Sequence, residues 1–139
     1  MKEVIEFKIN EAITNNATEF SLENYGISYL PTHLFEIRSL EVLNLNQNQL
    51  FEIPTEIEKL ENLRELNLCN NKLYNLPAGI SKLNRLEILN LSNNKFIEIP
   101  EPILSLSSLQ SLILTRNSIR KLPSAINKLQ KLQELYLWE

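Results

Sequence analysis

Aliphatic side chains return every 23 residues along most of the chain. Around each copy the sequence reads L-x-x-L-x-L-x-x-N-x-L-x-x-[LI]-P-x-x-I-x-x-L, and we number its positions from the first leucine. A strict period of this length predicts a solenoid of stacked units, because one unit alone has no neighbour against which to bury its apolar face. The leucines at position 1 are Leu40, Leu63, Leu86, Leu109 and Leu132.

Each unit is predicted to contain a short strand followed by a short helical segment. Positions 4 to 6, L-x-L, alternate with period two, and equivalent strands of neighbouring units would pair into a parallel sheet. Proline at position 15 suits the start of a helical turn, and the x-x-I-x-x-L after it has helical spacing. We therefore predict an α/β solenoid with short helical or 3-10 segments behind the sheet. The prolines are Pro31, Pro54, Pro77, Pro100 and Pro123.

The pattern divides the chain into a cap over residues 1–16 and repeats over residues 17–139. The repeats are five full units, the first of them degenerate, and a sixth that stops early. The cap is expected to cover the open core of the first unit. A strand is also possible there, since Ile5, Phe7 and Ile9 alternate, but we favour a helix over about residues 2–15. Its apolar face would be formed by Ile5, Ile9, Ala12 and Ile13.

Asparagine occupies position 9 of four units, directly after the strand. An amide at this place can donate and accept hydrogen bonds, and so satisfy backbone groups exposed by the turn. The first unit has Tyr25 instead, where no earlier unit needs such a bond. We therefore interpret this column as structural and not as ligand-binding. Its members are Asn48, Asn71, Asn94 and Asn117.

With these motifs the chain resembles the leucine-rich repeat family in its 23-residue L-P-x-x-I form. The resemblance covers residues 17–139, and the segment Ala17–Leu22 looks like the opening repeat of bacterial leucine-rich repeat proteins. The repeats are also similar to those of Roco-type GTPases and Ras-pathway scaffold proteins. The resemblance implies a curved solenoid whose parallel sheet lies on the concave side and recognises a partner protein there.

The variable strand positions are the candidates for partner binding. On the concave side the N-terminal units are acidic and amide-rich, whereas the C-terminal units carry apolar and aromatic residues. Aromatic residues and arginine are enriched at interface hot spots. The aromatic pair at the end could instead shield the last unit, and this alternative stays open. The candidate partner-binding residues are Ile88, Ile113, Arg116, Tyr136 and Trp138.

Two further apolar features have more than one interpretation. Phe51, Tyr74 and Ile97 form a column at position 12, which we expect to stack along the edge, although a side-face contact is the alternative. The sixth unit ends without a polar cap. The chain could be a segment of a longer protein, could form a homodimer through this open edge, or could be closed by its last strand.

Composition narrows the function further. The net charge is −3, and the first 70 residues carry −7 (12 Glu, 5 Lys or Arg) against +4 in the remainder (5 Glu, 9 Lys or Arg). This balance does not resemble a nucleic-acid binder, and no apolar run is long enough to span a membrane. Without a signal segment, and with Cys69 as the only cysteine, we expect a cytoplasmic protein without an intrachain disulfide.

The sequence also predicts no enzyme, no metal site and no cofactor. One histidine, one cysteine and no aspartate supply too few ligands for a metal site, and His33 is expected far from Cys69. With Gly26 and Gly79 as the only glycines, a glycine-rich phosphate loop is absent. The leading function is protein-protein interaction with an unknown partner protein. The alternative is the recognition segment of a larger signalling protein, a GTPase or scaffold.

Overall fold

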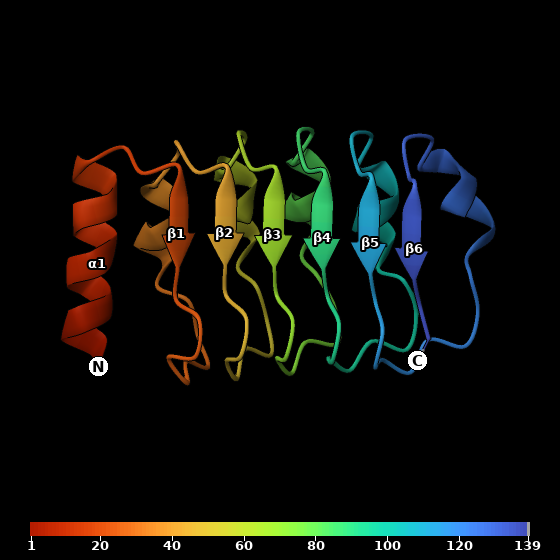
Figure 1. Cartoon of the computed structure of the whole chain (residues 1–139), viewed down its shortest axis with the longest axis horizontal. Coiled ribbons are helices and arrows are strands. Elements are labelled where there is room, and N and C mark those ends of the chain that lie inside the picture. Colours follow the sequence, from red (N-terminus) through yellow and green to blue (C-terminus); the bar gives the residue numbers. More distant parts are fainter. Residues whose placement is uncertain (139) are drawn as a thin grey trace.

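The computed structural model describes residues 1–138 and contains one open, parallel six-stranded sheet. The strands lie side by side in chain order (Figure 1), and each residue pairs with the residue 23 positions further along. This arrangement confirms the predicted solenoid and its register. The strands are β1 (Glu19–Ser21), β2 (Val42–Asn44), β3 (Glu65–Asn67), β4 (Ile88–Asn90), β5 (Ser111–Ile113) and β6 (Glu134–Tyr136).

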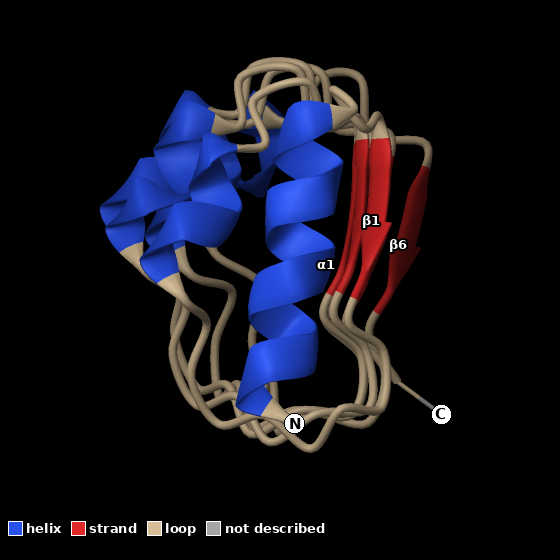
Figure 2. Ribbon diagram, turned by 90° about the vertical axis from the view of Figure 1, so that its left-hand side faces the viewer, coloured by secondary structure: helices blue, strands red, loops and turns tan. Residues whose placement is uncertain are grey.

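Short 3-10 helices form a second layer behind the sheet (Figure 2). Each begins directly after the proline of position 15, whose φ is already suited to a helical turn. The apolar residues at positions 18 and 21 of each helical segment turn toward the sheet. These helices are η1 (Thr32–Glu36), η2 (Thr55–Lys59), η3 (Ala78–Lys82), η4 (Glu101–Ser105) and η5 (Ser124–Lys128).

An α-helix, α1 (Lys2–Thr14), stands at the N-terminal end of the sheet (Figure 1). Ile5, Ile9 and Ala12 are buried against the first unit, as the helical spacing predicts. The segment is therefore helical and not a strand. Its opposite side is also apolar in part, because Val4 and Phe7 are 51% and 67% exposed.

The core is a stack of leucine and isoleucine columns between the two layers. In the central units these side chains are almost completely buried, because each is covered by equivalent side chains on both sides. Burial declines in the last unit, where Ile126, Leu132 and Leu135 are only partly buried and Leu122 is 38% exposed. The C-terminal end of the stack is thus the least covered part of the core within residues 1–138.

The asparagines of position 9 join neighbouring turns by hydrogen bonds. The Asn71 Nδ2 donates to the carbonyl oxygens of Leu45 at 3.0 Å and Leu68 at 3.1 Å, and its Oδ1 accepts from the Leu50 N–H at 3.0 Å. Asn48, Asn94 and Asn117 make the equivalent bonds in their own repeats. Each of these buried or partly buried amides therefore satisfies backbone groups of its own unit and of the preceding one.

Candidate functional site

The exposed face of the sheet is formed by positions 3 and 5 of each unit, which point away from the core because side chains alternate along a strand. We call it the sheet face. On β5 and β6 it carries Ile113 and Tyr136, which are direct register partners. Ile88 on β4 lies diagonal to Ile113, since its own partner on β5 is Ser111. Three apolar side chains from three consecutive strands are thus neighbours.

The exposure of these side chains decides what they can do. Tyr136 is 48% exposed and Ile88 is 37% exposed, whereas Ile113 is partly buried between its neighbours. Trp138 follows β6 and is 69% exposed, and it leaves most of its indole accessible. Arg116 is exposed in the turn after β5, with a left-handed φ of 54°. We call Ile88, Ile113 and Tyr136 the apolar patch of the sheet face.

The N-terminal part of the same face is polar for a reason that sequence reasoning missed. At position 5, the Oδ1 atoms of Asn44, Asn67 and Asn90 accept hydrogen bonds, at 3.0 to 3.1 Å, from the N–H two residues later. Each such bond closes a turn next to a residue with left-handed φ. These asparagines therefore stabilise the turn in addition to facing solvent.

Ile113 and Tyr136 stand where the preceding units have these asparagines. An aliphatic side chain has no acceptor, and a phenol has none near the backbone, so neither Ile113 nor Tyr136 can make this side-chain bond. The apolar patch thus replaces a turn-stabilising residue with one that offers contact area. This exchange separates the C-terminal units from the others on the sheet face.

Acidic residues of the sheet face lie on β1 and β3, and Glu134 adds one at the start of β6. Glu19 is exposed at the start of β1, and Glu65 occupies the equivalent place on β3. The Asn44 Nδ2 donates to the Glu23 carboxylate at 3.1 Å, which ties the turn after β1 to β2. A shallow depression of about 340 Å³ lies over β1 and β2 and is lined in part by Glu19, Ser21 and Asn44. The face therefore has no apolar patch at its N-terminal end, whereas at its C-terminal end the apolar patch lies beside Glu134.

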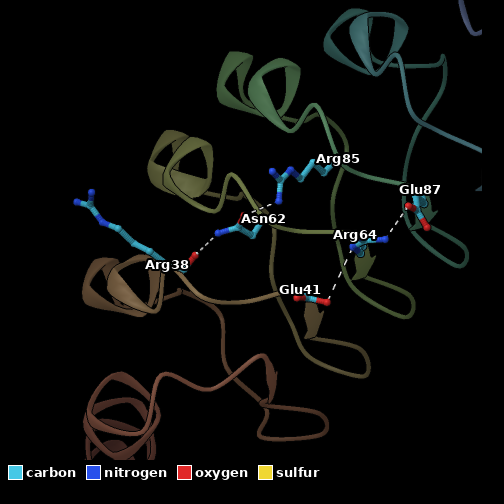
Figure 3. Close-up of polar contacts among 6 residues, drawn as sticks. All are labelled: Arg38, Glu41, Asn62, Arg64, Arg85 and Glu87. Atoms are coloured by element: carbon cyan, nitrogen blue, oxygen red, sulfur yellow. Dashed lines mark hydrogen bonds and ion pairs between the residues drawn. The ribbon is translucent and has the colours of Figure 1, made fainter.

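A polar network that the repeat consensus did not single out runs along the loops that precede the strands (Figure 3). Arg64 lies between Glu41, at 3.9 Å, and Glu87, at 3.2 Å. Beside this row the Asn62 Nδ2 donates to the Arg38 carbonyl oxygen at 3.1 Å, and Arg85 donates to the Asn62 Oδ1 at 2.9 Å. The signal in the sequence was the 23-residue spacing of Glu41, Arg64 and Glu87 at position 2.

The same edge holds a groove of about 690 Å³ between η2 and η3 and the loops after them. Its walls carry both charges, with Arg38, Lys59, Lys82 and Arg85 facing Glu58 and Glu61. Lys59, 2.6 Å from the carboxylate, and Arg38, 3.2 Å away, hold the pKa of Glu36 below its ordinary value. Exposed ion pairs of this kind contribute little to stability.

The Cys69 thiol and the His33 imidazole lie in different layers of the fold. The Cys69 Sγ lies 3.1 Å from the Ser92 Oγ, beside the sheet face. The only histidine, His33, is in η1 behind the sheet, with its Nε2 2.9 Å from a Glu6 carboxylate oxygen. Over residues 1–138 no group of three or more His, Cys or acidic side chains is placed to hold a metal ion. Within the same residues no helix has the length and hydropathy needed to cross a membrane.

Comparison with known proteins places the chain in a family. The model of the family described as Leucine rich repeat matches residues 38–96 and 61–119, which together are more than half of the chain. The chain therefore belongs to the leucine-rich repeat family. Domains of this family are typically protein-interaction modules and are generally not enzymes. No curated protein matches the sequence.

Solved structures give the same result for the fold. A leucine-rich repeat protein of Leptospira interrogans is 32% identical, with a TM-score of 0.88 over 92% of this chain and 33% of its own. The leucine-rich repeat ectodomain of the Arabidopsis thaliana receptor kinase GASSHO1/SCHENGEN3, in complex with CASPARIAN STRIP INTEGRITY FACTOR 2, is 36% identical, with a TM-score of 0.74. That match covers 91% of this chain and 16% of the receptor chain.

An internalin of Listeria monocytogenes has the same fold, with a TM-score of 0.75 at 22% identity over 92% of this chain and 37% of its own. The chain thus spans between about a sixth and about two fifths of the length of these three neighbours.

Proposed function

We propose that the chain binds a partner protein through the sheet face, with the apolar patch as the centre of the contact and Arg116 and Trp138 at its border. The observation that carries this proposal is the exchange at position 5, where Ile113 and Tyr136 replace asparagines that close the turn in the preceding units. Loss of a stabilising bond in favour of exposed apolar area is typical of a surface selected for contact.

The shape of the face supports the same function. The six parallel strands present a continuous row of side chains, with Glu19 and Glu65 on β1 and β3, and the apolar patch with Glu134 over β4 to β6. At about 4.8 Å per strand the row extends about 24 Å, which is adequate for one side of a standard interface. The proposal includes no chemical step, because the thiol of Cys69 and the imidazole of His33 lie on opposite layers.

Ile113→Asn tests the proposal with little risk to the fold. The new asparagine would copy Asn44, Asn67 and Asn90, and its Oδ1 could accept the Thr115 N–H, so we expect stability to be kept or raised by about 0.5–1 kcal/mol. The same change removes the centre of the apolar patch. The control is Phe7→Ser on α1, an exposed apolar residue distant from the sheet face.

Affinity capture from the source cell, with quantitative mass spectrometry, compares these variants with the unchanged chain. We expect a protein that is retained by the unchanged chain and by Phe7→Ser, and whose recovery falls about tenfold with Ile113→Asn. Equal recovery with all three baits would contradict the proposal. Trp138→Ala then shows which role the indole has. If less partner protein is recovered while the unfolding free energy is unchanged, Trp138 is a binding residue. If the unfolding free energy falls while the recovery of the partner is unchanged, Trp138 covers the last unit.

The same face would serve if the chain is the recognition segment of a larger signalling protein. This second possibility is favoured by the greater length of the three structural neighbours named above. Sequencing the messenger RNA beyond the codon for residue 139 tests it. A continuing reading frame would support the larger protein, and a stop codon would contradict it.

A further inference from the structure

A second apolar surface lies on the loops that follow the strands, at the lower edge of Figure 1. Tyr74 and Ile97, at position 12 of two consecutive units, are 66% and 71% exposed, and Leu122 of the next unit is 38% exposed. We call these three residues, with the groove between Ile97 and Leu122, the lateral surface. It is separate from the sheet face, because its side chains belong to the loops and not to the strands.

The groove gives this surface a shape. It has a volume of about 530 Å³ and lies between the loops of the fourth and fifth units. Ile97, Leu122 and Pro123 form its apolar part, whereas Glu98, Arg120 and Lys121 are polar residues of its walls. Apolar contact area combined with a few charged groups is the usual composition of a site that accepts a side chain of a partner.

Only the N-terminal part of the position-12 column is stacked against a neighbouring aromatic side chain. Tyr29 and Phe51 make an edge-to-face pair with ring centroids 4.9 Å apart, and Phe51 is partly buried. Within residues 1–138 Tyr74 has no aromatic partner, and Ile97 stands two-thirds exposed beside the groove. Among the described residues Phe51 thus makes its ring contact with Tyr29 and not with Tyr74, and the exposed areas of Tyr74 and Ile97 are left for contact.

The charges around the groove indicate the chemistry of the partner. Arg120 and Lys121 line it, and Lys95 is two residues before Ile97. None of these three cations has an ion-pair partner among the residues that the structure describes. The Nζ of Lys72, the equivalent of Lys95 one unit earlier, donates to the uncharged Gln49 amide oxygen at 3.2 Å. Glu98 is the one acidic residue of the groove. The groove thus carries two cations against one carboxylate, whereas the whole chain has a net charge of −3.

We propose that the lateral surface binds an acidic segment of a partner protein, with one apolar side chain in the groove and neighbouring carboxylates on Arg120 and Lys121. Apolar burial supplies the contact, and the cations select Asp- or Glu-containing segments over basic ones. This inference is independent of the function proposed for the sheet face, because no residue is shared between the two surfaces.

Selection from a random displayed peptide library on the immobilised full chain tests this inference. Peptides that also bind the Ile97→Ser variant are removed, so that those remaining depend on the groove. We expect them to combine a large apolar residue with flanking Asp or Glu. Affinity of a synthesised peptide should fall about tenfold with Ile97→Ser and by a similar factor with the Arg120→Glu/Lys121→Glu double variant.

Two controls distinguish this surface from the sheet face and from misfolding. Ile97 is an exposed residue, so Ile97→Ser should leave the circular dichroism spectrum and the unfolding midpoint unchanged. Ile113→Asn should leave peptide affinity unchanged, and it fails to do so if the peptides bind the sheet face. Added salt should weaken binding, because the cations are at the surface.

Three outcomes would overturn the inference. One is a set of selected peptides that are basic or uncharged. Another is binding that survives the Arg120→Glu/Lys121→Glu double variant. The third is dimerisation of the free chain in sedimentation experiments that is abolished by Ile97→Ser, since a second copy would then be the occupant.

Discussion

At the scale of single residues, the position-9 asparagines are the most sensitive polar groups of the chain. Asn71→Ala would leave the buried Leu50 N–H without its acceptor, and the carbonyls of Leu45 and Leu68 would each lose one of two amide donors. We expect a loss of about 2–4 kcal/mol in unfolding free energy, measured by urea denaturation. Asn84→Ala, at an exposed site, is the control and should change it by less than about 0.5 kcal/mol. Equal effects would show that the amide bonds of Asn71 are not stabilising.

The two asparagine columns show how far a sequence determines the role of a residue. The position-9 column has a single interpretation, because an amide that recurs after every strand faces the same turn each time. The position-5 column has no such unique interpretation, since a strand residue that points outward needs no partner. Its turn bond depends on the left-handed φ at position 8, which is adopted by Gln47 and Arg116 as well as by asparagines. Glutamine and arginine do not favour a left-handed φ, so the sequence did not indicate this backbone conformation at Gln47 and Arg116.

Glu36 provides a residue-scale prediction about pH. Its pKa is lowered mainly by the hydrogen bond from Lys59 and then by Arg38. The contribution of Glu36 to folding stability is therefore present above the ordinary carboxyl pKa and is lost as the pH falls through the lowered value. Lys59→Gln should bring the pKa of Glu36 back toward its usual range. A titration of the Glu36 carboxyl carbon by NMR measures this shift. An unchanged midpoint in the variant would contradict the assignment to Lys59.

At the scale of elements, the packing of 3-10 helices against one another limits which residues they accept. Gly79 in η3 is buried, and a Cβ at this position would overlap the Thr55 carbonyl oxygen in η2. Gly79→Ala should therefore push the two helices apart and cost about 1–3 kcal/mol of unfolding free energy. Ala78→Ser, on the exposed side of the same helix, is the control and should be neutral. Thermal unfolding of both variants tests this prediction. Equal unfolding midpoints would contradict it, because η3 would then move away from η2 without a loss of stability.

The elements themselves were predictable because each has a local cause. The alternating L-x-L predicted the strands, and the proline before each helical segment predicted its first residue, as Pro54 does for η2. The N-terminal segment was ambiguous, since Ile5 and Ile9 fit both periods. Burial of Ala12 together with these two isoleucines shows which period the packing against the first unit selects. The lateral groove was not predictable, because it arises between residues of two loops.

At the scale of the whole molecule, stability should decline toward the last unit. The isoleucines of position 18 are a matched series in which Ile57, Ile80 and Ile103 are fully buried and Ile126 is partly buried. Replacement by alanine should cost about 3–4 kcal/mol at Ile80 but only about 1–2 kcal/mol at Ile126, because the cavity in the last unit opens to solvent. Hydrogen exchange should likewise be fastest in η5 and β6 and slowest in the central strands.

Measuring the same alanine series at several protein concentrations also tests whether a second copy of the chain covers the last unit. Equal losses at Ile80 and Ile126 in dilute solution would contradict the gradient, since the last unit would then be as well covered as the central ones. Losses that become equal only at high concentration would have a different cause. They would show that a second copy covers the half-buried Leu132 and Leu135, because binding to the folded state alone raises its apparent stability with concentration. A sedimentation series on the Ile126→Ala variant separates these cases. If no second copy covers the last unit, the variant should remain monomeric at every concentration, and if one does, it should dimerise at high concentration.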